Sequence, residues 1–449
     1  MPASFTFAHM ADVHLGAFSK ELRGLNLQAF LTALDRCLLR KVDFVLIAGD
    51  LFHINVPDLA IVERAADKLR EVKDAGVPVY VWYGSHDYSP TEKSIIDVLA
   101  SAGLFTKVQG AEAGVDGGPL KLRFTEDPAT GAKVTAIAGK AQGLDRHLFA
   151  SLDRAALEGE PGFKVFGFHA AVREFLPGYL AHIEAVSVAD FPRGFGYYAG
   201  GHIHHYHEER REGYGPFVNP GPTFGSDGRD VQNDEPRGFV IATVAGERVE
   251  ARFEGVEVSP FLRLDLDVAG KTAHEARGAL EEQLAAAAVD GRAVVLRVHG
   301  EMASGKRSEL DLDALYARLP KLGARAVHIV KAYSVREAGR EGAAEAGAPQ
   351  AEVERRVFGA HLARFASLDA RFAGTRGIEL MLALKAALAE EAPPQRGGKT
   401  EFGERLRERA LGLLDREAGA GKAHVPTSAR PPEAAPGGPP RPERLEEFQ

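Results

Sequence analysis

The sequence has few of the features that mark secreted, membrane-spanning or disulfide-stabilised proteins. Cys37 is the single cysteine among 449 residues, so no disulfide can form within the chain. No apolar run reaches the roughly 18–20 residues that a membrane-spanning helix requires. Because Met1–Phe5 lack a basic segment followed by an apolar stretch, we expect no secretory signal. These absences predict a cytoplasmic protein with no membrane partner.

The chain also lacks an excess of positive charge. Its formal net charge is −8, with 45% hydrophobic and 26% charged residues. This composition is typical of a soluble globular protein, and the acidic total argues against the broadly basic surface of many autonomous nucleic-acid binders. DNA is not excluded, because a local groove or bound metal ions can supply positive charge. The length exceeds that of one ordinary core, so we expect two or three domains.

Polar side chains follow five apolar runs in the first half of the chain. These runs and the residues that follow them are Phe5–Met10 with Asp12 and His14, Val42–Ala48 with Asp50, Val77–Tyr83 with Ser85, His86 and Asp87, Phe163–Phe168 with His169, and Gly196–Ala199 with His202 and His204. Helical patterns such as 25–40 and 60–75 separate them, which predicts βα units with strands covered on both faces. Since ligands bind beyond the carboxyl ends of such strands, we expect the polar side chains to converge.

The residue types in these loops indicate a metal site. Carboxylates and imidazoles together suit manganese, iron or zinc, and the lack of cysteine ligands argues against a structural zinc site. Two metal ions roughly 3.5–4 Å apart can activate a water and stabilise the attacking and leaving oxygens of phosphoryl transfer. We therefore predict a dinuclear centre in which Asp50 bridges the two ions.

The order of these motifs resembles that of the calcineurin-like metallophosphoesterases. Asp12–Gly16 (Asp-Val-His-Leu-Gly) and Gly49–His53 (Gly-Asp-Leu-Phe-His) are similar to the SbcD-type DNA repair exonuclease branch. The resemblance implies an α/β fold, namely a two-sheet αββα sandwich with a smaller α+β capping domain and a helical C-terminal extension. It also implies a manganese-dependent DNA exonuclease and endonuclease subunit that acts in double-strand-break repair. Its partners would be an SbcC-type SMC-like ATPase and a second copy of the chain.

The resemblance further implies a role for each site residue. The ligands of one metal ion would be Asp12, His14 and His204, and those of the second His169 and His202, with Asp50 shared. His86 would contact the scissile phosphate and assist the leaving oxygen, and Asp87 would orient or polarise the His86 side chain. Ser85 departs from the family, which usually has an Asn ligand of the second metal here. Its shorter hydroxyl would bind the metal directly and weakly, or the contact would be made through water or lost.

Several residues near the motifs have plainer interpretations. We expect His205 and His207 to be solvated or supporting residues beside the ligand pair. His9 and Cys37 are predicted to be core residues. The Asn219–Pro222 segment is as consistent with a plain turn as with a loop that shapes the site.

The pattern changes from about Val256 onward. Strands are predicted at 261–268, 293–298 and 326–330, and helices at 272–287 and 312–319, which together form an α+β module. We therefore expect four regions: a nuclease domain (1–255), a capping domain (256–335), a linker with helices for the ATPase partner (336–417), and a disordered tail (418–449).

The C-terminal region is predicted to contain two helices after a Gly/Ala/Glu-rich linker at 339–349. Apolar residues recur at helical spacing in Val353–Phe372, and a second helix is expected at about 401–416. The resemblance implies that the first helix docks on the ATPase partner, and the alternative is that it packs on its own chain. The Gly- and Pro-dense tail is expected to be disordered.

Two other functions fit the same motifs. A phosphodiesterase or phosphatase for small molecules would use the same fold and metals, although it needs neither the α+β module nor the C-terminal helices. A non-catalytic scaffold is the other alternative, because Ser85 weakens the second metal site. Metal content and the hydrolysis of DNA against a small diester distinguish the three.

Overall fold

The computed structural model describes residues 4–18, 20–87, 93–108, 118–139, 145–336, 350–362, 374–388 and 407–414. The chain divides into two units, Met1–Glu337 and Ala338–Gln449. Within the described ranges, no helix is both long enough and apolar enough to cross a membrane.

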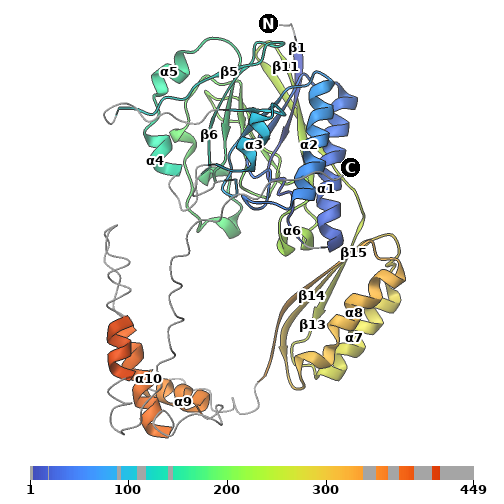
Figure 1. Cartoon of the computed structure of the whole chain (residues 1–449), viewed down its shortest axis with the longest axis vertical. Helices are drawn as coiled ribbons and strands as arrows, with labels where there is room; N and C mark the ends of the chain where they lie inside the picture. Colours follow the sequence, from blue (N-terminus) through green and yellow to red (C-terminus); the bar gives the residue numbers. More distant parts are fainter. Residues whose placement is uncertain are drawn as a thin grey trace, which may run out of the picture. The chain divides into compact units, whose positions relative to one another are not determined.

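The first unit is built around two six-stranded mixed sheets (Figure 1). The strands of the first sheet, in spatial order, are β12 (Arg248–Gly255), β11 (Gly238–Ala245), β1 (Ser4–Met10), β2 (Phe44–Ala48), β3 (Val79–Trp82) and β4 (Thr106–Lys107). Strands β1 to β4 run parallel. The antiparallel β11–β12 hairpin extends the sheet beyond β1.

The second sheet has the same mixed character. Its strands, in spatial order, are β5 (Thr125–Glu126), β6 (Lys133–Ile137), β7 (Lys164–Phe168), β8 (Tyr197–Ala199), β10 (Phe217–Asn219) and β9 (His207–Glu209). Strands β6, β7, β8 and β10 are parallel, and the two outermost strands are antiparallel to their neighbours.

Alternating side chains of the central strands fill two different cores. Phe44 and Leu46 of β2 lie in the cluster between the two sheets, whereas Val45 and Ile47 pack with α1 (Lys20–Arg40), α2 (Leu59–Asp74) and α3 (Ile95–Ser101). Each such side chain contributes about 1.5–3 kcal/mol by leaving water. Strands buried on both faces form because their sequences are uninterrupted apolar runs.

The outer face of the second sheet is covered in the same way. Phe166 and Phe168 of β7 pack with Phe149 of α4 (Asp145–Ala150) and Leu157 of α5 (Arg154–Gly159). Helices therefore flank both sheets, which confirms the predicted αββα sandwich (Figure 1).

The five strands predicted to precede ligand loops are all present as β1, β2, β3, β7 and β8. Seven further strands were not predicted. They are β4, β5, β6, β9, β10, β11 and β12.

The α+β module completes the first unit. Its parallel strands are β13 (Phe261–Asp267), β14 (Ala293–Met302) and β15 (Ala326–Val335). Helices α7 (Ala273–Ala286) and α8 (Leu312–Arg318) pack on one face of this sheet around a separate apolar core. The Thr272 side chain caps α7 in a capping box with Glu275.

In the second unit, α9 (Gln350–Leu362) packs against α10 (Gly374–Leu388). Residues 407–414 are helical and fall within the second predicted helix. The prediction of two helices missed α10, which lies between them. The predicted linker at 339–349 and the tail from 418 lie outside the described residues.

Candidate metal centre

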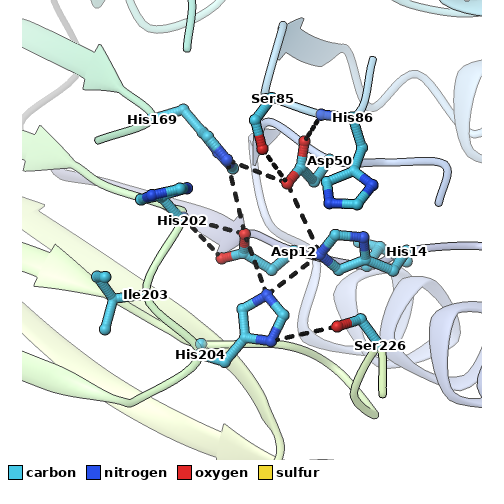
Figure 2. A network of polar contacts seen from close by, with 12 residues as sticks. Asp12, His14, Asp50, Ser85, His86, His169, His202, Ile203, His204 and Ser226 are labelled. Atoms are coloured by element: carbon cyan, nitrogen blue, oxygen red, sulfur yellow. Dashed lines mark hydrogen bonds and ion pairs between the residues drawn. The ribbon is translucent and has the colours of Figure 1, made fainter. Parts of the chain in front are cut away.

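The predicted site residues come from loops of both sheets and meet at one end of the sandwich (Figure 2). The loops after β1, β2 and β3 supply Asp12 and His14, Asp50, and residues 85–87. The loops after β7 and β8 of the second sheet supply His169 and residues 202–204. The convergence follows from topology, because the carboxyl ends of neighbouring parallel strands open on the same side.

The backbone around the site is strained. Asp12, His14, Asp50 and His202 have φ angles of 50°, 49°, 52° and 93°. Residues with a side chain rarely adopt this left-handed region, and each costs about 1–3 kcal/mol. The fold maintains this strain at four of the seven predicted ligand positions.

Glycines allow the ligand loops to approach each other closely. A Cβ atom on Gly84 would lie 2.2 Å from Asp50 Oδ1, and one on Gly49 would lie 2.3 Å from His169 Nδ1. Neither position has room for a side chain. The glycines of the two motifs are therefore explained by packing around Asp50 and His169.

Asp12, Asp50 and His169 form the buried inner side of the site, each no more than 2% exposed. His169 Nε2 lies 3.1 Å from Asp50 Oδ2 and 3.9 Å from Asp12 Oδ1. His169 Nδ1 lies 2.8 Å from the Ala48 carbonyl oxygen and donates to it, which turns Nε2 toward the two carboxylates.

This arrangement concentrates negative charge that needs a cation. Burial alone would lower the pKa of His169, but the Asp50 and Asp12 carboxylates raise it to about 10. The same attraction lowers the pKa of Asp50 despite its burial. His169 Nε2 is close to Asp50 Oδ2 but makes no hydrogen bond of good geometry. The site therefore favours a cation beside the two carboxylates, and a bound metal ion would take the place of the proton on His169 Nε2.

Backbone N–H groups hold both carboxylates from the opposite side. The His202 N–H donates to both oxygens of Asp12 at 3.0 Å, and the His86 N–H donates to Asp50 Oδ1 at 2.7 Å. Asp50 Oδ2 accepts from the Ser85 hydroxyl at 3.3 Å and faces the ring nitrogens of His169, at 3.1 Å, and of His14, at 3.7 Å. Asp50 Oδ2 thus faces imidazoles on two sides, and its role as the carboxylate shared between two ions stays a prediction.

The imidazoles of His14 and His204 meet on the other side of Asp12. Their Nε2 atoms are 3.1 Å apart, and His204 Nε2 is 3.8 Å from Asp12 Oδ1. Burial lowers the pKa of His14 well below its usual value, which leaves the neutral ring that metal binding requires. The ligand atoms of Asp12, His14 and His204 lie within 4.8 Å of one another, as do those of Asp12, Asp50 and His169.

His202 and Ser85 are placed less centrally. The His202 side chain is exposed, and its ring centre lies 5.2 Å from that of His169. The Ser85 hydroxyl donates to Asp50 Oδ2 at 3.3 Å. Both lie beside the inner side of the site, and their assignment to the second metal remains a prediction.

His86 is exposed at the mouth of the site, and its ring centre is 4.8 Å from that of His14. Its Nδ1 lies 2.7 Å from the His53 carbonyl oxygen, and the His53 ring stacks on it at 5.1 Å. His53 therefore holds the His86 ring in place through its carbonyl oxygen and its own ring. This role was not predicted, although His53 is the last residue of the Gly49–His53 motif.

The hydrogen bonds of Asp87 run to backbone groups, and its predicted role toward His86 stays a prediction. The Asp87 carboxylate accepts hydrogen bonds from the N–H groups of Asp50 at 2.7 Å, Gly84 at 3.0 Å and Phe52 at 3.4 Å. Burial and the nearby Asp50 carboxylate raise its pKa to about 7. Asp87 thus binds the two ligand loops together, and the His53 carbonyl holds the His86 ring.

The neighbouring predictions are largely met. His9 is buried and lies 3.1 Å from both the Tyr197 hydroxyl and the Gly200 carbonyl oxygen, and Cys37 is buried. His205 pairs with Glu235 at 3.1 Å. Asn219 donates to the Ile203 carbonyl at 3.0 Å, between the two ligand histidines, so this segment shapes the site.

Comparison with known proteins identifies the domain that carries this site. Residues 5–206 match the calcineurin-like phosphoesterase family. The match covers less than half of the chain. The match confirms the resemblance found in the sequence motifs. The donor set of the matched region fits two divalent metal ions, because its carboxylates and imidazoles form two groups in which all ligand atoms lie within 4.8 Å of one another.

The chain is also similar to proteins named DNA double-strand break repair protein Mre11. It is 28% identical over 202 residues to that of Methanococcus maripaludis, covering 44% of this chain and 51% of the relative. For Archaeoglobus fulgidus the identity is 29% over 208 residues, covering 44% and 45%. For Methanopyrus kandleri it is 30% over 279 residues, covering 59% of each. The chain thus spans about half the length of the curated relatives it matches.

Proposed function

We propose that the chain is a dinuclear-metal phosphodiesterase that cleaves DNA. The observation that carries the proposal is the inner side of the site, where Asp12, Asp50 and His169 are buried together and aim their free atoms at one another. Such an arrangement is costly without bound cations. The phosphoesterase family match supports hydrolysis of a phosphate ester.

In this proposal the two metal ions are held by the residues predicted from the sequence. Asp12, His14 and His204 would bind one ion, and His169, His202 and Ser85 the other, with Asp50 between them. When bound, the ions would neutralise phosphate charge and make a water nucleophilic near neutral pH. Manganese is our choice among the metals that suit carboxylate and imidazole ligands.

The protein side chains position the substrate. His86 stands exposed next to His14, so its Nε2 is available to a phosphate oxygen while Nδ1 is engaged by the His53 carbonyl. A protonated His86 would stabilise charge on the phosphate and donate to the leaving oxygen. Asp87 keeps the loops that carry Asp50 and His86 in register.

A DNA substrate is favoured over a small diester. The similarity to proteins named for DNA double-strand break repair supports it, and so does the α+β module, which a small-molecule enzyme does not need. We propose that residues 1–255 act as the nuclease domain and 256–335 as its cap, in exonuclease and endonuclease reactions of break repair.

The proposed partners are an SMC-like ATPase and a second copy of the chain, in the cytoplasm. Residues 336–417 would dock on the ATPase through helices such as α9, on which Val357 is exposed.

The test is manganese-dependent cleavage of an end-labelled DNA duplex, measured beside hydrolysis of a chromogenic phosphodiester. We expect the wild-type chain to cleave DNA, alone or with the ATPase partner and ATP. Asp50→Ala should abolish cleavage, and His86→Ala should lower its rate by about 10²–10⁴-fold. Hydrolysis of the small diester without cleavage of DNA would support the small-molecule alternative. Inactivity on both substrates would support a scaffold.

A further inference from the structure

We propose that Asp230 is a positioning residue that holds the imidazole of His204 in the orientation required for metal binding. Asp230 belongs to α6 (Gly228–Gln232), outside every ligand motif of the sequence. The inference rests on the proposed function, because His204 is relevant here as a metal ligand.

The contact between the two side chains fixes the protonated nitrogen of His204. Asp230 Oδ2 lies 2.8 Å from His204 Nδ1. Since the carboxylate can only accept, Nδ1 must donate, and the lone pair of a neutral ring is then on Nε2. Nε2 is the atom that faces His14 and Asp12 in Figure 2. A carboxylate behind a ligand histidine commonly acts in this way.

Asp230 is itself held firmly. The same oxygen, Oδ2, accepts from the Ser226 N–H at 2.7 Å and from the Ser226 hydroxyl at 3.2 Å. Arg237 lies 3.9 Å from Oδ1 and donates to the Asp230 backbone carbonyl at 2.7 Å. With 7% of its surface exposed, Asp230 has little freedom to move. A buried carboxylate with this many donors costs little to keep in place.

The α+β module holds α6 from its other side. Arg263 of β13 donates to the Val231 carbonyl at 2.8 Å and pairs with Asp234. Val231 is buried in the same apolar cluster as Val295 of β14. The position of Asp230 therefore depends on contacts from the module as well as from the phosphoesterase domain.

The neighbouring residue offers a matched control. His205 also has a carboxylate partner, Glu235, at 3.1 Å. His205 is not in any of the candidate ligand groups among the described residues. Loss of Glu235 removes the same charge from the same region without touching the partner of a ligand.

The experiment is calorimetric titration of the metal-free full chain with manganese chloride. We expect wild type to bind two ions and Asp230→Ala to weaken one of the two sites by about 10–100-fold. Asp230→Asn should lose less, because its amide oxygen still accepts from Nδ1–H. Glu235→Ala should stay within about 2-fold of wild type. Circular dichroism melting checks that each variant is folded.

Unchanged manganese affinity in a folded Asp230→Ala chain would overturn the inference and leave the proposed function standing. Equal weakening by Asp230→Ala and Glu235→Ala would also overturn it, because local charge would then explain the effect. A wild-type chain that takes up no manganese would overturn the proposed function, and this inference with it.

Discussion

The inner and outer sides of the candidate metal centre are built differently. On the inner side, Asp12, Asp50 and His169 are buried, and each side chain makes a hydrogen bond with a backbone group. On the outer side, defined here as Ser85, His86 and His202, the two imidazoles are exposed and Ser85 is half-buried.

This difference indicates that the buried inner side binds the metal ions and that His86, on the outer side, contacts the substrate. A ligand fixed by burial and backbone contacts is positioned before any ion arrives, whereas an exposed imidazole can reach a phosphate that comes from solvent. Substitutions on the inner side should therefore cost metal binding. Substitution of His86, the one outer-side residue that is not proposed as a ligand, should cost rate while the metals stay bound.

The largest effect is expected from Asp50→Ala. This change removes the carboxylate proposed to bridge both ions and leaves buried His169 without its close partner. We expect loss of manganese binding at both sites and no measurable cleavage. Calorimetry and elemental analysis of the dialysed chain measure it, and retention of two ions would contradict the assignment of Asp50.

His86→Ala should produce the opposite pattern. Because its ring lies at the mouth of the site and its backbone N–H, not its side chain, holds Asp50, both metals should remain bound. The cleavage rate should fall by about 10²–10⁴-fold, as for loss of a general acid. Steady-state kinetics on labelled DNA test the rate, and loss of metal would place His86 among the ligands instead.

Asp87→Ala should affect folding more than chemistry. The carboxylate accepts three backbone N–H groups, and leaving these buried donors without an acceptor should cost roughly 3 kcal/mol of unfolding free energy. Denaturant unfolding of the metal-free chain measures this loss. Asp127→Ala is the comparison, because Asp127 is another buried carboxylate that accepts from a backbone N–H group, that of Thr130, but lies outside the ligand loops. Its loss should lower the unfolding free energy without changing manganese affinity. An unaltered unfolding midpoint for Asp87→Ala would show that Asp87 does not hold the loops.

Ser85→Asn tests the departure from the family pattern. The Ser85 hydroxyl donates to Asp50 Oδ2, and an Asn amide oxygen would reach further and act as a ligand. We expect about 10-fold tighter binding of one manganese ion, the lower end of the range for partners of a metal site. Calorimetric titration with manganese, fitted to two sites, measures this affinity. Equal affinities in Ser85→Asn and wild type would contradict the expectation and would mean that Ser85 already supports binding of the second ion.

The smallest effect is expected from His205→Ala. His205 pairs with Glu235 rather than with the ligand set, so metal affinity and cleavage rate should each stay within about 2-fold of wild type. A loss comparable with that of His86→Ala would move His205 into the site.

The sequence predicted the parts of the fold that are encoded locally. Strands such as β2 are uninterrupted apolar runs with a ligand loop behind them, and these were found. Strand β4 has two residues and β9 has three, too few for a pattern to show. Strand β11 carries an apolar run, but no ligand motif follows it. The pattern of an apolar run before a polar loop therefore did not predict it.

The same distinction applies to the site. Ligands such as Asp12 and His204 stand in short motifs, because the turn that carries them also needs glycine and a strained backbone. Asp230 meets His204 only through folding, from a helix 26 residues further along. The contacts by which Asp87 joins the two loops were not predicted for a related reason: its place next to His86 in the sequence does not show which backbone groups its carboxylate accepts from.

The most direct test of the central claim is electron paramagnetic resonance of the chain loaded with manganese. Two ions bridged by Asp50 should give the spectrum of a spin-coupled manganese pair in wild type, and Asp50→Ala should lose it. A wild-type spectrum that contains only isolated manganese ions, at any loading, would contradict the dinuclear centre.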